Sequence, residues 1–222
     1  MPRPRPFLLA CLLFACAEES PPTPAPPAAP PAAPAAPSTP AAAPAVDLLA
    51  ATSDPGGEPD LGRASAAARM VGLQLKQRMV KAMSDGGPDA AVRVCADEAQ
   101  GLTALIQGRT GVRVGRSSRR LRNPANAGPD WVQAWLAEND GKPASEVSPM
   151  EAVVDTPEGR MARVALPIGV DAPCLLCHGA SDTLAPGIRT MLSERYPDDA
   201  ATGYAAGDLR GVLWAEATAQ GG

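Results

Sequence analysis

The sequence predicts an α+β domain in which N-terminal helices come before a small antiparallel sheet. Apolar residues recur at helical spacing over residues 63–106, and short strand-like segments between turn residues follow as far as residue 217. No internal repeat is present. Residues 60–218 therefore have the size and pattern of one domain.

Two helices are expected at the start of this domain. The first spans residues 63–83 and should end in the Ser-Asp-Gly-Gly run at 84–87, because glycine readily adopts the positive φ of a helix end. Pro88 suits the first position of the second helix, which continues to about residue 106. Cys95 falls on the apolar face of this second helix, so its side chain is predicted to point inward.

Strands are expected where alternating or β-branched residues lie between turns. They cover residues 111–115, 151–155, 161–168 and 211–217. A short helix should begin near Asp130 and another should cover residues 186–195, with a helical turn at 174–179. This order of elements completes the α+β prediction.

The first 15 residues have the pattern of an export signal peptide. Two arginines precede an apolar run at residues 7–15, which is too short to span a membrane. The run ends in Leu-Phe-Ala before Cys16, a sequence similar to a bacterial lipobox. We therefore expect cleavage before Cys16 and a lipid anchor on this residue, with an uncleaved anchor as the alternative.

Residues 16–59 are predicted to form a linker that carries the lipid. Most of this segment consists of Pro, Ala, Ser and Thr, which cannot bury a core and favour extended polyproline II conformation. At about 3.1 Å per residue, roughly 25 such residues would reach on the order of 80 Å. The linker would hold the domain away from a membrane. A spacer without a required length and a docking segment are the alternatives.

The strongest functional signal is the run Cys174-Leu175-Leu176-Cys177-His178. In c-type cytochromes, two thiols at this spacing bind the haem vinyl groups and the following histidine binds the iron. We therefore predict one covalent haem on Cys174 and Cys177, with His178 as the proximal iron ligand. Export is consistent with this prediction, because such haems are attached outside the cytoplasm.

Three alternatives for this motif stay open. A thioredoxin-like redox pair would need a βαβ setting, which the pattern lacks. A structural disulfide would suit an oxidising compartment. A zinc site would need four ligands, which Cys95 and the three motif residues could supply, although adjacent ligands at 177 and 178 suit one tetrahedral ion poorly.

The identity of the second protein ligand of the iron can be narrowed by counting the histidines and cysteines of the chain. His178 is the only histidine, so two-histidine ligation within the chain is excluded. The sixth ligand is then Cys95, a methionine, a weaker group, or none. A lone buried cysteine is usually a small hydrophobe. Beside a haem without a second histidine, however, Cys95 is favoured as the distal ligand.

Basic residues gather just after the second predicted helix, whereas the chain as a whole has a formal charge of −4. The acidic balance argues against nucleic acid as a partner. The basic cluster comprises Arg113, Arg116, Arg119, Arg120 and Arg122. It forms either a solvated turn or a counter-charge for haem propionates or for an acidic redox partner.

Several short motifs, in this order, resemble a family of bacterial single-haem c-type domains with a PAS-like fold and unknown function. The resemblance covers residues 63–214. It rests on Gly86-Gly87-Pro88 with Val94-Cys95, Val114-Gly115-Arg116-Ser117-Ser118, Arg122-Asn123-Pro124-Ala125-Asn126, Pro129-Asp130-Trp131, Pro167-Ile168, Cys174–Gly179, Tyr196–Ala200 and Gly203–Gly211.

The resemblance implies a PAS-like antiparallel sheet that holds the haem. It also implies that Cys95 is the distal axial ligand and that Arg122 and Asn123 lie near the haem pocket. Members of the family occur alone and as sensor domains of signalling proteins.

The predicted function is low-potential electron transfer by an exported mono-haem cytochrome on the periplasmic side of a bacterial membrane. The alternative is a haem-based redox or gas sensor that acts through a separate partner, since the sequence contains no output domain. An enzyme such as a peroxidase is not expected, because it needs an open iron site and distal acid–base groups. The partner is accordingly a redox protein or a signalling protein.

Overall fold

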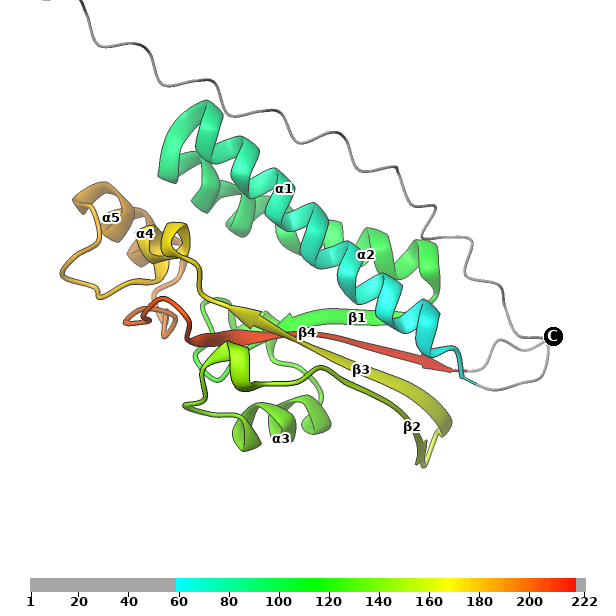
Figure 1. Ribbon diagram of the computed structural model, residues 1–222. Coiled ribbons are helices and arrows are strands. Elements are labelled where there is room, and N and C mark those ends of the chain that lie inside the picture. Colours follow the sequence, from blue (N-terminus) through cyan, green and yellow to red (C-terminus); the bar gives the residue numbers. More distant parts are fainter. Residues whose placement is uncertain (1–58, 219–222) are drawn as a thin grey trace, which may run out of the picture. The chain divides into compact units, whose positions relative to one another are not determined.

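The computed structural model describes residues 59–218, which form a four-stranded antiparallel sheet with helices on both faces (Figure 1). The strand order is β1-β4-β3-β2. The strands are β1 (Arg113–Ser117), β2 (Met150–Thr156), β3 (Gly159–Gly169) and β4 (Leu209–Thr218). The α+β prediction is confirmed. The predicted signal peptide, Cys16 and nearly all of the linker lie outside the described residues.

A helical hairpin opens the described part of the chain. The continuous helix α1 (Leu61–Arg93) contains a break at Gly87, whose φ of 71° is readily available to glycine because it has no Cβ. Pro88 follows at the start of the returning arm, as predicted. This arm passes through a π-helical segment, Val94–Glu98, into α2 (Ala99–Thr110). The sequence predicted both arms but not the π-helical segment.

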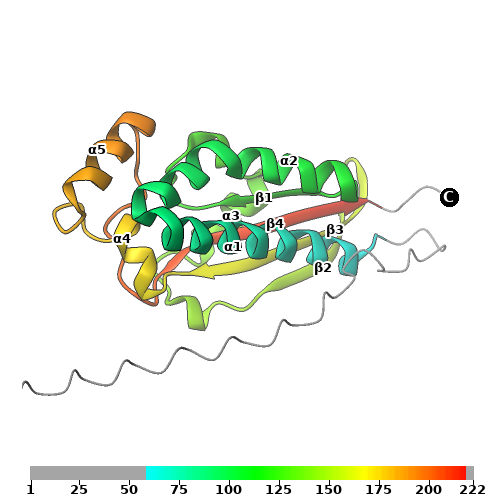
Figure 2. The same ribbon diagram turned by 90° about the horizontal axis from the view of Figure 1, so that it is seen from above.

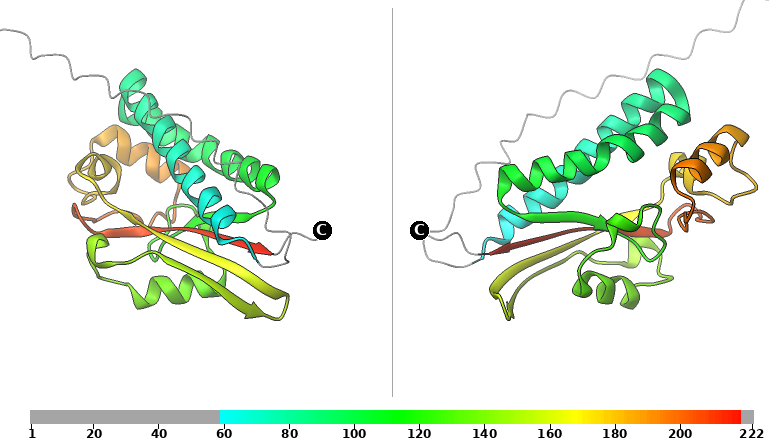
Figure 3. Two further views of the ribbon diagram at one scale, coloured as in Figure 1. Left: turned by 45° about the vertical axis from the view of Figure 1, so that its right-hand side comes forward. Right: turned by 180° about the vertical axis from the view of Figure 1, so that it is seen from behind.

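The two faces of the sheet pack against different helices (Figures 1 and 3). Successive strand residues point to opposite faces. Val164 of β3 therefore packs under α1 and α2, whereas its neighbour Ala165 packs against α3 (Asp130–Glu138). β4 alternates in the same way, with Ala215 on the first face and Trp214 on the second.

A smaller lobe extends from one end of the sheet, beside the turn of the helical hairpin (Figure 2). It contains α4 (Leu175–His178) and α5 (Pro186–Arg195), which confirms the helical turn and the helix predicted there. Val92 of the hairpin packs against Ile188 and Leu192 of α5. Among the described residues, no helix is both long and apolar enough to cross a membrane.

One carboxylate is buried within the sheet itself. Glu216 of β4 is only 3% exposed and accepts hydrogen bonds from three groups. Arg113 Nη1 donates to Glu216 Oε2 at 2.6 Å, while Arg163 Nε and Trp131 Nε1 donate to Oε1 at 3.0 and 2.7 Å. This charge is therefore fully paired inside the protein.

Candidate functional site

The Cys-x-x-Cys-His motif forms a compact turn at the junction of the sheet and the smaller lobe. A 3-10 turn, Ala172–Cys174, leads directly into α4. Gly179 ends the turn, and a Cβ at this position would lie 2.7 Å from the Leu175 carbonyl oxygen. Cys174 packs against the cluster of Val170 and Tyr204, while Cys177 packs against the cluster around α5. Each thiol therefore meets an apolar surface.

The imidazole of His178 is held with one nitrogen free. Its Nδ1 lies 2.7 Å from the carbonyl oxygen of Ala201. Because a carbonyl only accepts, Nδ1 carries the proton and donates it, which leaves a lone pair on Nε2. Burial, together with the positive charges of Arg122 and Arg210, lowers the pKa of His178 to about 3. This neutral tautomer is the form in which histidine binds a metal.

Arg122 stabilises the Cys-x-x-Cys-His turn through several hydrogen bonds. Its side chain is 9% exposed, and its Nε donates to Asp199 Oδ2 at 3.0 Å. Its Nη2 donates to the carbonyl oxygens of Cys177, at 2.5 Å, and Ala201, at 3.4 Å. The same Ala201 carbonyl accepts from His178, so one guanidinium fixes both the turn and the partner of the imidazole.

Asn123 has a local structural role and also borders a cavity. Its Oδ1 accepts a hydrogen bond from the backbone N–H of Ala125 at 2.9 Å and caps the 3-10 turn Pro124–Asn126. The cavity, of about 240 Å³, is lined by Asn123, Arg122, Ala96 and Tyr196 among others. The two residues that the family resemblance assigned to a pocket thus border one cavity.

Cys95 lies in the π-helical segment, and its side chain is half-buried. Burial raises the pKa of the Cys177 thiol, Arg122 opposes this shift, and Cys95 adds to it. Ala96, the next residue after Cys95, packs against the same apolar cluster as Cys177, so the hairpin brings together residues about 80 positions apart in the sequence. π-Helical turns within α-helices occur frequently at functional sites.

Four of the five arginines in the basic cluster have partners. Arg113 pairs with Glu216, Arg119 with Asp140 and Arg122 with Asp199, while Arg120 stacks on the Tyr204 ring at 3.5 Å. Arg116 is the exception. Within residues 59–218 its side chain has no hydrogen bond or ion pair with another side chain or backbone group, although its backbone pairs with Leu213 of β4.

Arg116 lies on the face of β1 that packs under the returning helical arm, toward the π-helical segment Val94–Glu98 that contains Cys95. Val114 and Arg116 lie on the same face of β1, and Val114 packs against Leu102 and Ile106 of the returning helical arm. That arm runs antiparallel to β1, so the strand position two residues beyond Val114 lies about one helical turn before Leu102. Burial lowers the pKa of Arg116, and the neighbouring Cys95 and Tyr196 oppose this shift.

The geometry also bears on the alternatives to haem. None of the three described cysteines forms a disulfide. In the part of the chain that the structure describes, no three His, Cys, Asp or Glu side chains are grouped to hold a metal ion. The donors instead comprise a neutral imidazole, two thiols against apolar surfaces, and a third thiol nearby. In this set, Cys174, Cys177 and His178 could hold a covalent haem, with Cys95 as a further donor nearby.

Comparison with known proteins agrees with the predicted family. A family described as Tll0287-like matches residues 51–215. The chain belongs to the Tll0287-like family. The crystal structure of the cyanobacterial heme-protein Tll0287 is 24% identical, covers 72% of this chain and 94% of its own, and superposes with a TM-score of 0.53. This likeness shows a shared fold. No curated protein matches the chain.

Three features of this Tll0287-like chain escaped the sequence analysis. The π-helical segment around Cys95 has no sequence signal, because helical periodicity continues on both sides of it. The partnerless state of the Arg116 side chain depends on the packing of β1. Tyr204 and Arg210 lie beside His178 only because the last loop folds back, and the Tyr204 N–H donates to the His178 carbonyl oxygen at 2.9 Å.

Proposed function

We propose that residues 60–218 bind one haem c, attached through Cys174 and Cys177 and ligated by His178 Nε2. The observation that carries the proposal is the 2.7 Å contact of His178 Nδ1 with the Ala201 carbonyl oxygen, which leaves Nε2 free directly after two thiols. The Tll0287-like family, which includes a cyanobacterial heme-protein, supports it. When bound, the haem supplies a one-electron ferric–ferrous couple.

The proposed distal ligand is Cys95. Three observations support this assignment: Cys95 lies in the π-helical segment, it lies close to Cys177, and the chain has no second histidine. A thiolate donates electron density and stabilises the ferric state, which gives a low reduction potential. Arg116, which makes no ion pair within residues 59–218, is close enough for its charge to interact with that of Cys95, and it supplies a compensating positive charge.

Arg122 and Asn123 have different parts in the proposed site. Arg122 orients the motif and its histidine through the Cys177 and Ala201 carbonyl oxygens. Asn123 shapes the loop next to the 240 Å³ cavity. We therefore assign Arg122 to positioning, and we keep Asn123 as a residue of the pocket wall.

The function that this arrangement supports best is electron transfer by an exported, lipid-anchored cytochrome with a separate redox partner. Two protein ligands on the iron favour transfer over catalysis, since a peroxidase needs an open site and acid–base groups. Export and anchoring at Cys16 rest on the sequence alone, and they place the domain on the periplasmic side of a membrane. Nucleic acid is not a proposed partner.

One observation favours sensing as the second candidate. Cys95 lies on a helical arm that begins at the Gly87 break, whereas His178 lies on a separate lobe. If the Cys95–iron bond weakens on reduction, a shift of the arm would change the packing of Val92 against α5 and so pass to the lobe. A signalling partner would read that movement.

A potential titration of the visible spectrum, with and without carbon monoxide, tests these functions. Fast reversible reduction without gas binding is expected for the carrier. Carbon monoxide binding on reduction would assign the sensor function instead. A ferric iron that binds peroxide in the resting protein would contradict both.

A further inference from the structure

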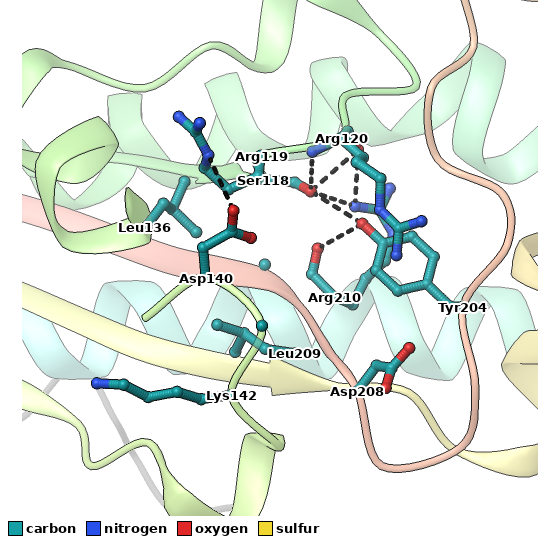
Figure 4. A pocket seen from close by; sticks show the side chains of 12 residues that line it. Ser118, Arg119, Arg120, Leu136, Asp140, Lys142, Tyr204, Asp208, Leu209 and Arg210 are labelled. Carbon is teal, nitrogen blue, oxygen red and sulfur yellow. Dashed lines mark hydrogen bonds and ion pairs between the residues drawn. The ribbon is translucent and has the colours of Figure 1, made fainter. Parts of the chain in front are cut away.

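A second cavity is lined by Tyr204, whose ring also lies against the His178 imidazole, and by Leu136 of α3 (Figure 4). Its volume is about 200 Å³. The side chains that matter most are Ser118, Arg120, Leu136, Tyr204, Leu209 and Arg210. The cavity therefore combines cationic groups with an apolar wall, and nothing in the proposed haem site uses it.

Arg210 carries a positive charge on which the Asp199 carboxylate acts only at a distance, because Asp199 pairs with Arg122. Its Nη1 donates to Ser118 Oγ at 2.7 Å and to the Arg120 carbonyl oxygen at 3.2 Å. Across residues 59–218 it makes no ion pair, although it is half-buried and burial lowers its pKa. A buried charge is costly unless a counter-ion pairs with it.

Arg120 adds a second guanidinium that forms no ion pair with any residue of the described range 59–218. It stacks on the Tyr204 ring at 3.5 Å, and its Nη1 donates to the Thr202 carbonyl oxygen at 2.9 Å. The acidic residues at the cavity are already engaged. Asp140 lies 3.9 Å from Arg119, and Asp208 Oδ2 accepts from the Ala205 N–H at 2.7 Å. The cavity therefore presents unbalanced positive charge on the side of Arg120 and Arg210.

The shape and chemistry of the cavity limit its ligand. A guanidinium fork matches the two oxygens of a carboxylate. A cavity of roughly 150 Å³ holds benzene, so one of about 200 Å³ accommodates on the order of six to eight heavy atoms. Leu209 provides an apolar wall for a short tail, and Leu136 beside it is only 1% exposed. We propose that this cavity binds a small monocarboxylate through Arg210 and Arg120.

Ligand binding in this cavity would change the reduction potential of the proposed haem. Tyr204 lies between the two sites, with its ring centroid 6.2 Å from that of His178 and 5.3 Å from the Arg210 guanidinium carbon. A bound carboxylate neutralises Arg210 and removes positive charge near the iron ligand. Less positive charge favours ferric over ferrous iron, so the potential falls. This coupling rests on the proposed function, whereas the carboxylate site does not.

Binding of butyrate, with butyramide as its uncharged analogue, tests the site. Titration of the full chain, followed by calorimetry and ligand-observed NMR, should give saturable butyrate binding and at least tenfold weaker butyramide binding. The variant Arg210→Gln should lose at least tenfold in affinity. Arg109→Gln, which removes the same charge from an exposed position on α2, should bind as the wild type does.

The wild-type comparison decides the matter even where Arg210→Gln fails to fold. Absence of saturable butyrate binding, or equal binding of the amide, would overturn the site. The double variant Cys174→Ala, Cys177→Ala should bind butyrate as the wild type does, so failure of the haem proposal is distinguishable. In haem-loaded protein, butyrate but not butyramide should lower the potential. Binding without such a shift would overturn the coupling.

Discussion

Two groups of polar residues, one around the buried Glu216 in the body of the sheet and one half-buried at its end, differ in how completely the protein satisfies their hydrogen bonds and charges. Glu216 receives hydrogen bonds from Arg113, Arg163 and Trp131, and its charge is balanced within the fold. At the sheet end, His178 keeps an unused nitrogen and the Arg116 side chain has no partner within the described residues. The first group stabilises the fold, while the second keeps unused hydrogen-bonding and charged groups, as a binding site does.

Whether a polar residue has all its hydrogen bonds and charges satisfied distinguishes structural from functional residues in this domain. Arg122 illustrates the boundary, because its own bonds are satisfied but serve to hold the motif. Replacing residues of the satisfied group should therefore change stability. Replacing residues of the open group should leave stability nearly intact and change the haem.

The largest stability effect is expected for Glu216→Ala. It leaves the partly buried donors of Arg163 and Trp131 without their acceptor, which costs about 3–5 kcal/mol. Urea unfolding followed by circular dichroism measures the loss. Glu151→Ala, an exposed carboxylate on β2, should cost within about 0.5 kcal/mol. Equal losses in the two variants would remove the distinction between them.

Arg122→Met should have a smaller effect on stability but a double consequence. Loss of its charged hydrogen bonds to Asp199 and to the Cys177 carbonyl costs about 2–3 kcal/mol. The loosened turn should also lower the yield of haem attachment, measured by absorbance per protein. Arg119→Met, an exposed neighbour, is the control. Full attachment in Arg122→Met would contradict the positioning role.

Cys95→Ala should cost about 1 kcal/mol or less, because the side chain is small and half-buried. Its main effect should be on the iron. Loss of the thiolate should abolish the ferric low-spin spectrum and raise the reduction potential. Met79→Leu on the first arm of the hairpin is the matched control. An unchanged spectrum in Cys95→Ala would transfer the sixth position to another group, with Met70, Met79 and Met83 next.

Arg116→Gln should have the smallest effect on stability, within about 0.5 kcal/mol, since no hydrogen bond is lost. Removing its positive charge beside Cys95 should lower the reduction potential, because a positive charge favours ferrous iron. Arg109→Gln should leave the potential unchanged. An unchanged reduction potential in Arg116→Gln would show that the charge of Arg116 does not act on the iron.

The sequence predicted most of the fold because its signals are local. Gly87 and Pro88 mark the turn of the hairpin, and residues 186–195 form the predicted helix. The candidate site was predicted in part, since Cys-x-x-Cys-His is a local motif and His178 is unique. The rest depends on tertiary contacts. The partner of His178 Nδ1 is a backbone carbonyl 23 residues away, and the second cavity needs the last loop to fold against β1.

The central claim is that Cys174 and Cys177 carry one covalent haem. The most direct test is the intact mass of the chain produced with a haem-attachment system, together with its alkaline pyridine spectrum. We expect the wild-type chain to gain the mass of one haem and to show a c-type spectrum. The double variant Cys174→Ala, Cys177→Ala should lose both. An unmodified mass, or bound zinc without haem, would contradict it.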